Sequence, residues 1–556
     1  MKFSRIIALI LCLCMVLLLV ACGGQQESQA PAGSEDTSEA SAPSSGEGKT
    51  MVVAIPDTPP NIDHAVGAAT TVQYMLLANC MDCGSNFKFV KSAEDEDCLI
   101  PTGYTPDDIV PCLLESWELS EDGSECTYHI RKGIKSAYGN ELTSADYAWK
   151  FDRHIAMGAV GNVWMVAENV VKDGKVNYEI IDDYTFKVKS DGSNALHEII
   201  TSGMFDQVWD STEAKAHATT DDPWATDYIN RTACGFGPYY VTEWKAGEQI
   251  VIEANPNYFE PLDITKVIFL VVPENANRVA MLESGEIDMA LELSNQEIDY
   301  LGGVDGVKTI NISSNAHDLL IMNEQVCEPF SDVKVRQAVN YAIPHDDIIK
   351  TAYYGQANQQ ASVGARLFGQ SVDESEWIYS YDLDKAKALM AESAYPDGFS
   401  VELYYNADWP AHESAALLLQ KSLANIGIKI DLRATPAGTY DTQSRTYQLP
   451  MAIIHEYAAL PNLAFEMTLH YLSTELGGAY GAFGYYSSKT TDDLLLAAAG
   501  TADQAQYVHD AEINIMNDAA YGWMVDTNYT CAVRDNIDGF NWDVSMGTYF
   551  KMMTKN

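Results

Sequence analysis

Apolar residues along the chain change repeatedly between the spacing of strands and the spacing of helices. Met51–Ile55 is a short apolar run that predicts a strand. Apolar residues at every second position predict two half-buried strands, one at Tyr128 and Ile130 and one over residues 184–188. Val267–Val272 is continuously apolar and has the length of a strand, so we expect a strand covered on both faces.

The clearest helix signals lie in the second half of the chain. Asp382 can cap a helix that runs from Leu383 to about Ala394. A second predicted helix ends at Gly427 and leads into the alternating strand Ile428–Leu432. Its apolar stripe consists of Ala416, Leu419, Leu423 and Ile426. This succession of helices and strands is typical of a layered α/β fold.

The N-terminal segment has the pattern of a secretion signal. Lys2 and Arg5 precede the apolar run Ile6–Val20, which is short for a membrane span. The run ends in Leu-Val-Ala-Cys followed by two glycines, and this resembles a bacterial lipobox. We therefore expect residues 1–21 to be removed and Cys22 to carry a lipid anchor. An ordinary signal peptide or a single-pass anchor is the alternative.

Composition narrows the classes of protein that fit the rest of the chain. Residues 22–49 are rich in Ser, Ala, Gly, Gln, Glu and Pro, and we expect a disordered tether. With 47% apolar residues in 556, the remainder has material for about three to four domains. The 34 Lys and Arg against 79 Asp and Glu give a net charge of −45. This excess argues against nucleic-acid binding and against a polybasic membrane surface.

Four cysteines crowd into one stretch of the chain, at Cys80, Cys83, Cys98 and Cys112. In an exported protein, one or two disulfides are the favoured interpretation. A four-thiolate zinc site and free thiols remain alternatives. We expect no cofactor and no resident metal.

Several short motifs follow one another in a set order. They are Pro111–Trp117, Tyr128–Gly133, Gly139–Asp146, Gly235–Tyr239, Arg278–Asp288 and Val333–Ile343. In this order they resemble the family 5 extracellular solute-binding proteins, the peptide, dipeptide and nickel receptors of ABC importers. Most of these residues are expected to be structural. Arg336 is expected to form a buried ion pair at a domain junction.

The resemblance implies an α/β fold with two lobes, a periplasmic-binding-protein-like clamp of type II with an additional inserted α+β domain. Carried over to this chain, it implies lobe I at 51–79, 191–310 and 522–556, the inserted domain at 80–190, and lobe II at 311–521. The chain would then cross between the lobes near residues 310 and 521. Closure about these crossings would bury the ligand.

The resemblance also suggests which residues face the ligand. In peptide-binding members, a strand of the second lobe pairs with the ligand backbone and a nearby acid receives the α-ammonium group. Ile454, Glu456 and Tyr457 occupy the corresponding stretch, although the family's Trp is missing and its Asp-Pro has become Leu-Pro. The carboxylate can bind an ammonium group, and a solvent-facing Glu456 at a strand end is the alternative.

Further candidates come from the first lobe and from aromatic residues. The loop that contains Asp63, Thr70 and Thr71 is expected to face the cleft. Four aromatic residues fall near the expected cleft edges and can stack on a ligand, with core packing as the alternative: Tyr404, Tyr405, Trp409 and Trp523. His412, His455 and His470 show no metal-binding spacing, and we expect each at the surface.

Together these patterns predict a lipid-anchored, monomeric receptor on the outer face of the bacterial cytoplasmic membrane. It would capture a peptide or similarly sized solute and deliver it to an ABC permease with its ATPase. A surface sensor or adhesin, a nickel, haem or oligosaccharide binder, and an exported hydrolase are the alternatives. No His-Glu-x-x-His or Gly-x-Ser-x-Gly motif supports the hydrolase.

Overall fold

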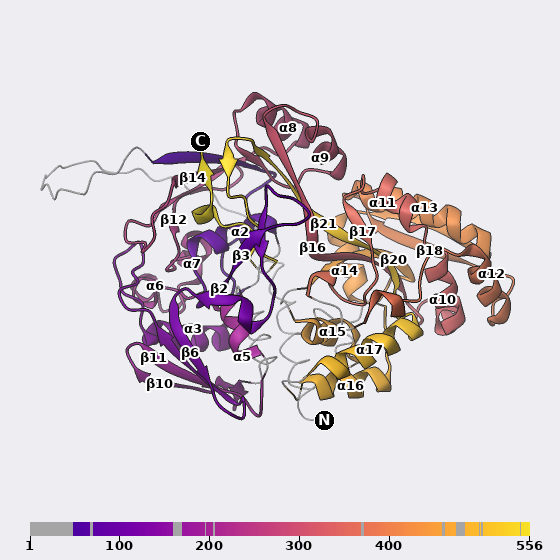
Figure 1. The fold of residues 1–556 in the computed structure, drawn as a ribbon, viewed down its shortest axis with the longest axis horizontal. Helices are drawn as coiled ribbons and strands as arrows, with labels where there is room; N and C mark the ends of the chain where they lie inside the picture. The colour runs from indigo at the N-terminus through magenta and orange to yellow at the C-terminus, as the bar shows by residue number, and fades with distance from the viewer. Residues whose placement is uncertain are drawn as a thin grey trace, which may run out of the picture.

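The computed structural model describes the chain from residue 48 onward, apart from short internal gaps (Figure 1). The described ranges are 48–66, 70–158, 170–194, 196–203, 206–368, 372–458, 462–473, 484–499, 501, 504–544 and 546–556. The predicted signal peptide, Cys22 and the tether up to residue 47 lie outside them. Within these ranges, no helix is both long and apolar enough to cross a bilayer.

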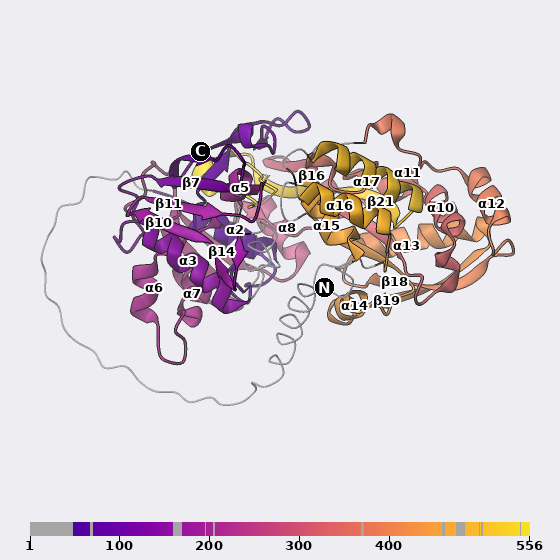
Figure 2. The ribbon, with the colours of Figure 1, turned by 90° about the horizontal axis from the view of Figure 1, so that it is seen from below.

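Two bodies lie side by side and share one 11-stranded sheet (Figures 1 and 2). The strand order is β12-β13-β14-β1-β15-β21-β16-β20-β18-β19, and β17 pairs with β21 beside this path. The strands of the first body are β1 (Lys49–Ile55), β12 (Tyr239–Lys245), β13 (Gln249–Ala254), β14 (Ile264–Val271) and β15 (Met289–Ala290). Those of the second body are β17 (Ala357–Gln359), β18 (Phe399–Asn406), β19 (Ile428–Thr435) and β20 (Met451–Tyr457). The strands common to both bodies are β16 (Val307–Met322) and β21 (Gly522–Arg534).

The first body, which corresponds to lobe I, packs its helices around β1 and β14. These helices are α2 (Thr71–Cys80), α5 (Leu196–Ile199), α6 (Ser211–His217), α7 (Thr226–Thr232), α8 (Asn275–Ser284) and α9 (Asn295–Leu301). Short two-stranded pairings involve β2 (Ser85–Phe87), β3 (Phe89–Lys91), β4 (Leu99–Pro101), β5 (Ile109–Pro111), β22 (Ile537–Asp538) and β23 (Thr554–Lys555). The predicted strand over Val267–Val272 forms as β14, but it was expected to be covered on both faces. Val267 and Phe269 are buried while alternate residues are only half-buried, so one face alone is fully packed.

A small sheet with the order β10-β11-β7-β6 forms a satellite of the first body. Its strands are β6 (Leu114–Leu119), β7 (Glu125–Ile130), β10 (Tyr178–Asp182) and β11 (Thr185–Lys189). Helix α3 (Ser144–Met157) packs against β10, and β8 (Val171–Lys172) and β9 (Lys175–Val176) form a separate two-stranded pair beside it. The predicted alternating strands are confirmed as β7 and β11. Thr143 begins α3 with a capping box, in which the Asp146 carboxylate accepts from the Thr143 backbone N–H at 2.8 Å. This contact gives the Gly139–Asp146 motif a structural role.

The second body, which corresponds to lobe II, encloses its part of the sheet between helices on both faces. The helices are α10 (Val333–Tyr341), α11 (His345–Thr351), α12 (Leu383–Glu392), α13 (Pro410–Leu423), α14 (Ala437–Arg445), α15 (Leu463–Tyr471), α16 (Lys489–Ala499) and α17 (Ala505–Asp518). Asp382 caps α12 as predicted, and its carboxylate accepts from the Lys385 backbone N–H at 2.9 Å. The predicted stripe packs in the core of this body, and the chain turns at Gly427 with a φ of 84° into β19.

The chain passes between the two bodies inside β16 and β21, later than residues 310 and 521 that the sequence suggested. Ile310 and Ile312 belong to the core of the first body, and Leu319 belongs to that of the second. On β21, Trp523 packs in the second body and Cys531 packs in the first. The crossings are difficult to predict because both strands continue through them without a break.

Candidate functional site

The two lobes meet where the first turn of α2 faces the end of β20. The hydroxyl groups of Tyr74 on α2 and Tyr457 on β20 lie close together across the lobe boundary. Tyr457 keeps 41% of its surface exposed, although burial of its hydroxyl raises the pKa. The loop predicted to face the ligand from lobe I and the strand predicted to face it from lobe II therefore come together here.

Thr70 and Thr71 lie one turn before Tyr74, at the N-terminal end of α2. The Thr70 hydroxyl caps the helix and accepts from the Gln73 backbone N–H at 3.2 Å. The Thr71 hydroxyl lies near the carboxylate of Glu292, whose pKa is raised by burial. Both threonines are placed beside the lobe contact, and their role in binding stays a prediction.

Asp63 was expected to face the cleft, and the structure corrects this. Its carboxylate is fully buried and accepts two hydrogen bonds from the Arg153 guanidinium of α3, at 2.8 and 2.5 Å. The guanidinium also lies over the Trp209 ring, 4.6 Å from the ring centroid. Asp63 anchors the loop that leads to α2, and does not present its charge to a ligand.

The outer edge of β20 is open where the strand approaches the lobe contact. On one side, β16 pairs with β20 along its length, from Met322 opposite Met451 to Ala316 opposite Tyr457. On the other side, β18 pairs with it only as far as Ala452. Within the described residues, the stretch from 453 to 457 has no strand on that side. An extended chain can add to such an edge.

Ile454 and Glu456 differ in what they can offer a ligand. The Ile454 side chain is buried in the lobe II core, so only its backbone is placed at the open edge. Glu456 is half-buried and makes no hydrogen bond with any described residue. Burial raises the pKa of Glu456 to about 7, against the opposing effect of Arg445 and His455. A carboxylate in this state gains an interaction when a cation arrives.

Trp409 packs beside β20, against a cluster of polar side chains around the buried Asp318. Asp318 of β16 accepts from Tyr353, lies 3.1 Å from His412 Nε2 and lies 2.7 Å from His455 Nδ1. Burial would raise the pKa of Asp318, but the two histidines hold it well below its ordinary value. The Trp409 ring packs against His412 and His455 with centroids 4.8 and 4.6 Å away, and 39% of the residue is exposed. It lies near the carboxyl ends of β18 and β20, where α/β proteins commonly bind ligands.

The other three aromatic candidates do not join this site. Trp523 is 1% exposed and stacks on Tyr379 in the lobe II core, and Tyr405 is buried in the same core. Both residues were expected at the cleft. They pack in the core instead, because β18 and β21 direct these two side chains toward the helices of lobe II. Tyr404 points to the opposite face of β18, where its hydroxyl donates to Glu402 at 2.8 Å.

Comparison with known proteins places this geometry in a family. The model of bacterial extracellular solute-binding proteins, family 5 Middle, matches residues 108–477. The chain belongs to this family. Its relatives include heme-binding protein A of Haemophilus influenzae, 28% identical over 58% of this chain and 61% of that protein. They also include the "Probable D,D-dipeptide-binding periplasmic protein DdpA" of Escherichia coli, 24% identical over 80% of this chain and 85% of that protein.

Solved structures confirm the fold of this family 5 protein. The periplasmic binding protein DppA of Helicobacter pylori, solved with the peptide STSA, superposes with a TM-score of 0.76 at 23% identity. The match covers 91% of this chain and 98% of the DppA chain. The predicted two-lobed clamp of type II is therefore confirmed.

None of the described cysteines of this family 5 protein forms a disulfide, which corrects the favoured disulfide interpretation. Cys80, Cys83, Cys98 and Cys112 are all free and buried. Burial raises the pKa of Cys80 and of Cys112 to about 12, so these thiols stay protonated. Among the described residues, no group of His, Cys, Asp and Glu side chains has a geometry that could hold a metal ion.

The structure adds residues that the sequence reasoning missed. His412 and His470 were expected at the surface, but they are 1% and 6% exposed. His317, Asp526 and Glu466 are buried as well, close to Glu456. The sequence held one signal for such residues, a charged or polar residue inside an otherwise apolar strand. Asp526, which follows Trp523-Met-Val, is an example.

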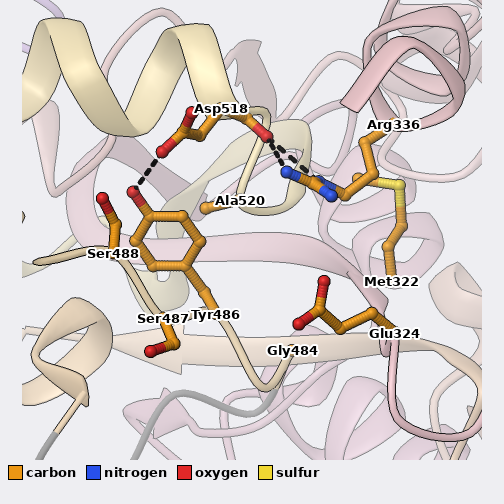
Figure 3. A pocket seen from close by; sticks show the side chains of 9 residues that line it. All are labelled: Met322, Glu324, Arg336, Gly484, Tyr486, Ser487, Ser488, Asp518 and Ala520. Atoms are coloured by element: carbon orange, nitrogen blue, oxygen red, sulfur yellow. Dashed lines mark hydrogen bonds between the residues drawn. The ribbon is translucent and has the colours of Figure 1, made fainter. Parts of the chain in front are cut away.

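A separate cavity of about 200 Å³ lies within lobe II, at the far end of β16 (Figure 3). It is lined by Met322, Glu324, Arg336, Gly484, Tyr486, Ser487, Ser488, Asp518 and Ala520. Arg336 was expected to form an ion pair at a domain junction. Instead its guanidinium donates to the carbonyl oxygens of Asp518, at 2.6 Å, and Phe330, at 2.7 Å, inside one lobe. None of the predicted ligand-facing residues lines this cavity.

Proposed function

We propose that this protein captures a peptide or similarly sized solute between its two lobes and delivers it to an ABC permease and its ATPase. The observation that carries the proposal is the meeting of α2 and β20 across the lobes, next to an open strand edge and an unpartnered carboxylate. Two of the relatives support it, since DdpA is named for a dipeptide and DppA was solved with a tetrapeptide.

The open edge of β20 and the Glu456 carboxylate have complementary roles in this proposal. The ligand backbone adds to residues 453–457 as a further strand, which supplies affinity without reading side chains. The α-ammonium group of the ligand binds Glu456. Closure of the two lobes then brings Tyr74, near the N-terminal end of α2, over the bound ligand.

A thermal-shift screen tests binding directly. A ligand that binds only the folded protein raises the melting temperature by mass action. We expect a pool of di- to tetrapeptides to raise it at a concentration where pools of free amino acids, sugars and nickel salts do not. The proposal is overturned if the peptide pool leaves the melting temperature unchanged.

We further propose that the mature protein is held on the outer face of the cytoplasmic membrane by a lipid on Cys22. The support is the sequence pattern around this residue. Cys22→Ala should move the protein from the membrane fraction to the soluble fraction. Retention of the variant in the membrane fraction would contradict lipid anchoring and favour an uncleaved apolar anchor.

A further inference from the structure

On the face of β20 opposite Glu456, a buried carboxylate is surrounded by hydrogen-bond donors. Asp318 of β16 lies directly opposite His455 of β20, and residues in such a pair project from the same face of the sheet. His455 Nδ1 lies 2.7 Å from one carboxylate oxygen of Asp318, and His412 Nε2 of α13 lies 3.1 Å from the other. The Tyr353 hydroxyl also donates to this second oxygen. These four residues, without Glu456, form the Asp318 cluster.

The Asp318 cluster needs a positive charge, because a buried carboxylate is costly without a cation. Among the described residues, the ion-pair partners of Asp318 are His412 and His455, and no lysine or arginine joins them. Burial alone would raise the pKa of Asp318, but the two histidines hold it well below its ordinary value. One of the two imidazoles is therefore suited to carry the proton that balances the carboxylate.

Hydrogen bonding favours His455 for this proton. His412 is 1% exposed, and its Nδ1 atom has no hydrogen-bond partner among the described residues. A proton on that atom would leave a buried N–H group unsatisfied. The His455 side chain is 26% exposed, so an N–H group at its Nε2 atom can contact water or a ligand. The expected state has an imidazolium at His455 and a neutral ring at His412.

His455 and Glu456 serve opposite faces of β20. Successive residues of a strand project from opposite faces, so the Glu456 side chain points away from the Asp318 cluster. His317, which precedes Asp318 on β16, points to that other face too. Within the part of the chain that the structure describes, Asp318 is the one carboxylate that forms an ion pair with His455. The Nε2 side of this imidazolium is therefore open to a further anionic group.

The Nε2 side of His455 lies at the open edge of β20, beside Trp409. The centroids of the two rings are 4.6 Å apart with the planes at 63°, and the Trp409 side chain is exposed. A ligand strand that adds to residues 453–457 directs alternate side chains to the face that carries His455. One side chain or one terminus of the ligand then meets a cationic N–H group next to an indole ring.

We propose that His455, oriented by Asp318 and flanked by Trp409, forms a subsite for a carboxylate group of the ligand. This inference rests on the proposed function and names the class of peptide, one with an acidic side chain or a free C-terminal carboxylate at this place. The imidazolium donates a charge-assisted hydrogen bond from Nε2 to the carboxylate, and the apolar part of the ligand packs on the indole. Asp318 is a positioning residue, because it contacts His455 and not the ligand.

The test compares peptides in which a carboxylate is replaced by the neutral amide of the same shape. Tripeptides of alanine carry glutamate or glutamine at the first, second or third position, and a fourth pair of trialanine peptides carries a free or an amidated C-terminus. Calorimetry at pH 7 measures the affinities. We expect the acid to bind about tenfold more tightly than the amide in one pair. The pair that shows this preference identifies the carboxylate as that of a side chain or of the C-terminus.

Two variants connect the preference to the Asp318 cluster. His455→Gln keeps a side chain that can donate to Asp318 but removes the cation, so the acid-to-amide ratio should fall toward one while the affinity for the amide peptides stays unchanged. Asp318→Asn is the second test variant and should lower the ratio in the same way. His509→Gln is the matched control and should keep the ratio, since His509 of α17 also pairs with a carboxylate, that of Glu376 at 3.3 Å. Circular dichroism and melting curves establish that each variant is folded.

The outcomes separate this subsite from the proposed function. Equal affinities within all four pairs overturn the subsite while peptide binding stands. A preference for the acid that survives in folded His455→Gln overturns it as well, because another group then binds the carboxylate. Absence of binding by every peptide overturns both the subsite and the proposed function.

Discussion

At the scale of single residues, Glu456 is distinguished by what it does not contact. It lies at the end of β20, beside the inter-lobe contact of Tyr457, and makes no hydrogen bond with a described residue. Burial raises its pKa to about 7, so near neutral pH the group exists in both protonation states. A positively charged ligand shifts it to the charged state.

Glu456→Gln should weaken peptide binding. Replacing a charge-assisted hydrogen bond by a neutral one costs roughly 1.5–3 kcal/mol, which corresponds to an affinity about 10- to 100-fold lower in calorimetry. The exposed Glu392→Gln is the matched control and should bind as the unmodified protein does. An unchanged affinity in Glu456→Gln would remove the ammonium contact from the account.

Glu466 should make stability depend on pH. Its pKa is raised from 4.5 to about 8 by burial, so the folded protein holds this proton more tightly than the unfolded chain does. Stability from this group is therefore fully present below pH 4.5 and is lost as pH rises toward 8. Glutamine cannot ionise, so Glu466→Gln should be more stable than the unmodified protein at pH 8, by on the order of 2–4 kcal/mol, with the difference vanishing near pH 4.5.

Urea unfolding of both proteins between pH 4.5 and pH 8.5 measures this difference. The exposed control Glu392→Gln should show none. A difference between Glu466→Gln and the unmodified protein that stays constant with pH would mean that Glu466 titrates near its ordinary value.

The candidate residues show what the sequence can and cannot predict at this scale. Residue type and family position selected Glu456, Tyr457 and Trp409, which the structure places in one region, and their role in binding stays a prediction. They failed for Tyr405 and Trp523, because the spacing along a strand does not tell which face points to the cleft and which to the core. His317 escaped notice because its neighbours on β20 and β21 are distant in sequence.

At the scale of elements, the contact between α3 and the loop before α2 positions the lobe I side of the cleft. Arg153 and Asp63 are both fully buried, and the pair joins the satellite sheet region to this loop. A buried charge without its partner is costly. The ion pair therefore ties the stability of the fold to the geometry of the cleft.

Arg153→Met should destabilise the protein by about 3–5 kcal/mol, because it leaves the Asp63 carboxylate buried and unpaired. Arg433→Met is the matched control, since Arg433 forms only exposed ion pairs with Glu402 and Asp431 and should cost about 0–1 kcal/mol. Chemical unfolding measures both. Adding Asp63→Asn to Arg153→Met should restore part of the loss, and equal effects of the two arginine substitutions would contradict the role of the buried pair.

Elements with local signals were predictable, and the connections between lobes were not. Asp382 and Gly427 fix the ends of α12 and of the turn after α13 through contacts with near neighbours, so the sequence showed them. β16 and β21 cross from one lobe to the other in mid-strand, where no proline, glycine or polar run marks the change. The crossings depend on which core each side chain joins, and this is a property of the whole fold.

At the scale of the whole molecule, the described cysteines distinguish this protein from disulfide-linked exported domains. No disulfide links any of the eight described cysteines, and all of them except Cys327 are buried. The folded cores rather than covalent links hold the lobes together. Reducing agents should therefore have no effect on stability.

Thiol labelling tests this arrangement without any substitution. In the unfolded, unreduced protein, all eight of these cysteines should react with iodoacetamide, as counted by peptide mass spectrometry. In the folded protein, Cys327 alone among these eight should react readily, because the other seven side chains are buried and inaccessible to the reagent. Detection of a disulfide-linked peptide from the unreduced protein would contradict the structure at that pair.

Native mass spectrometry of protein purified without denaturation tests the central claim most directly, because it reports what the two lobes hold. The account predicts a complex with one peptide-sized solute per chain, exchangeable for an added tripeptide and weakened in Glu456→Gln. A protein that carries no such solute and takes up no tripeptide, while it binds a sugar or a metal ion instead, would contradict it.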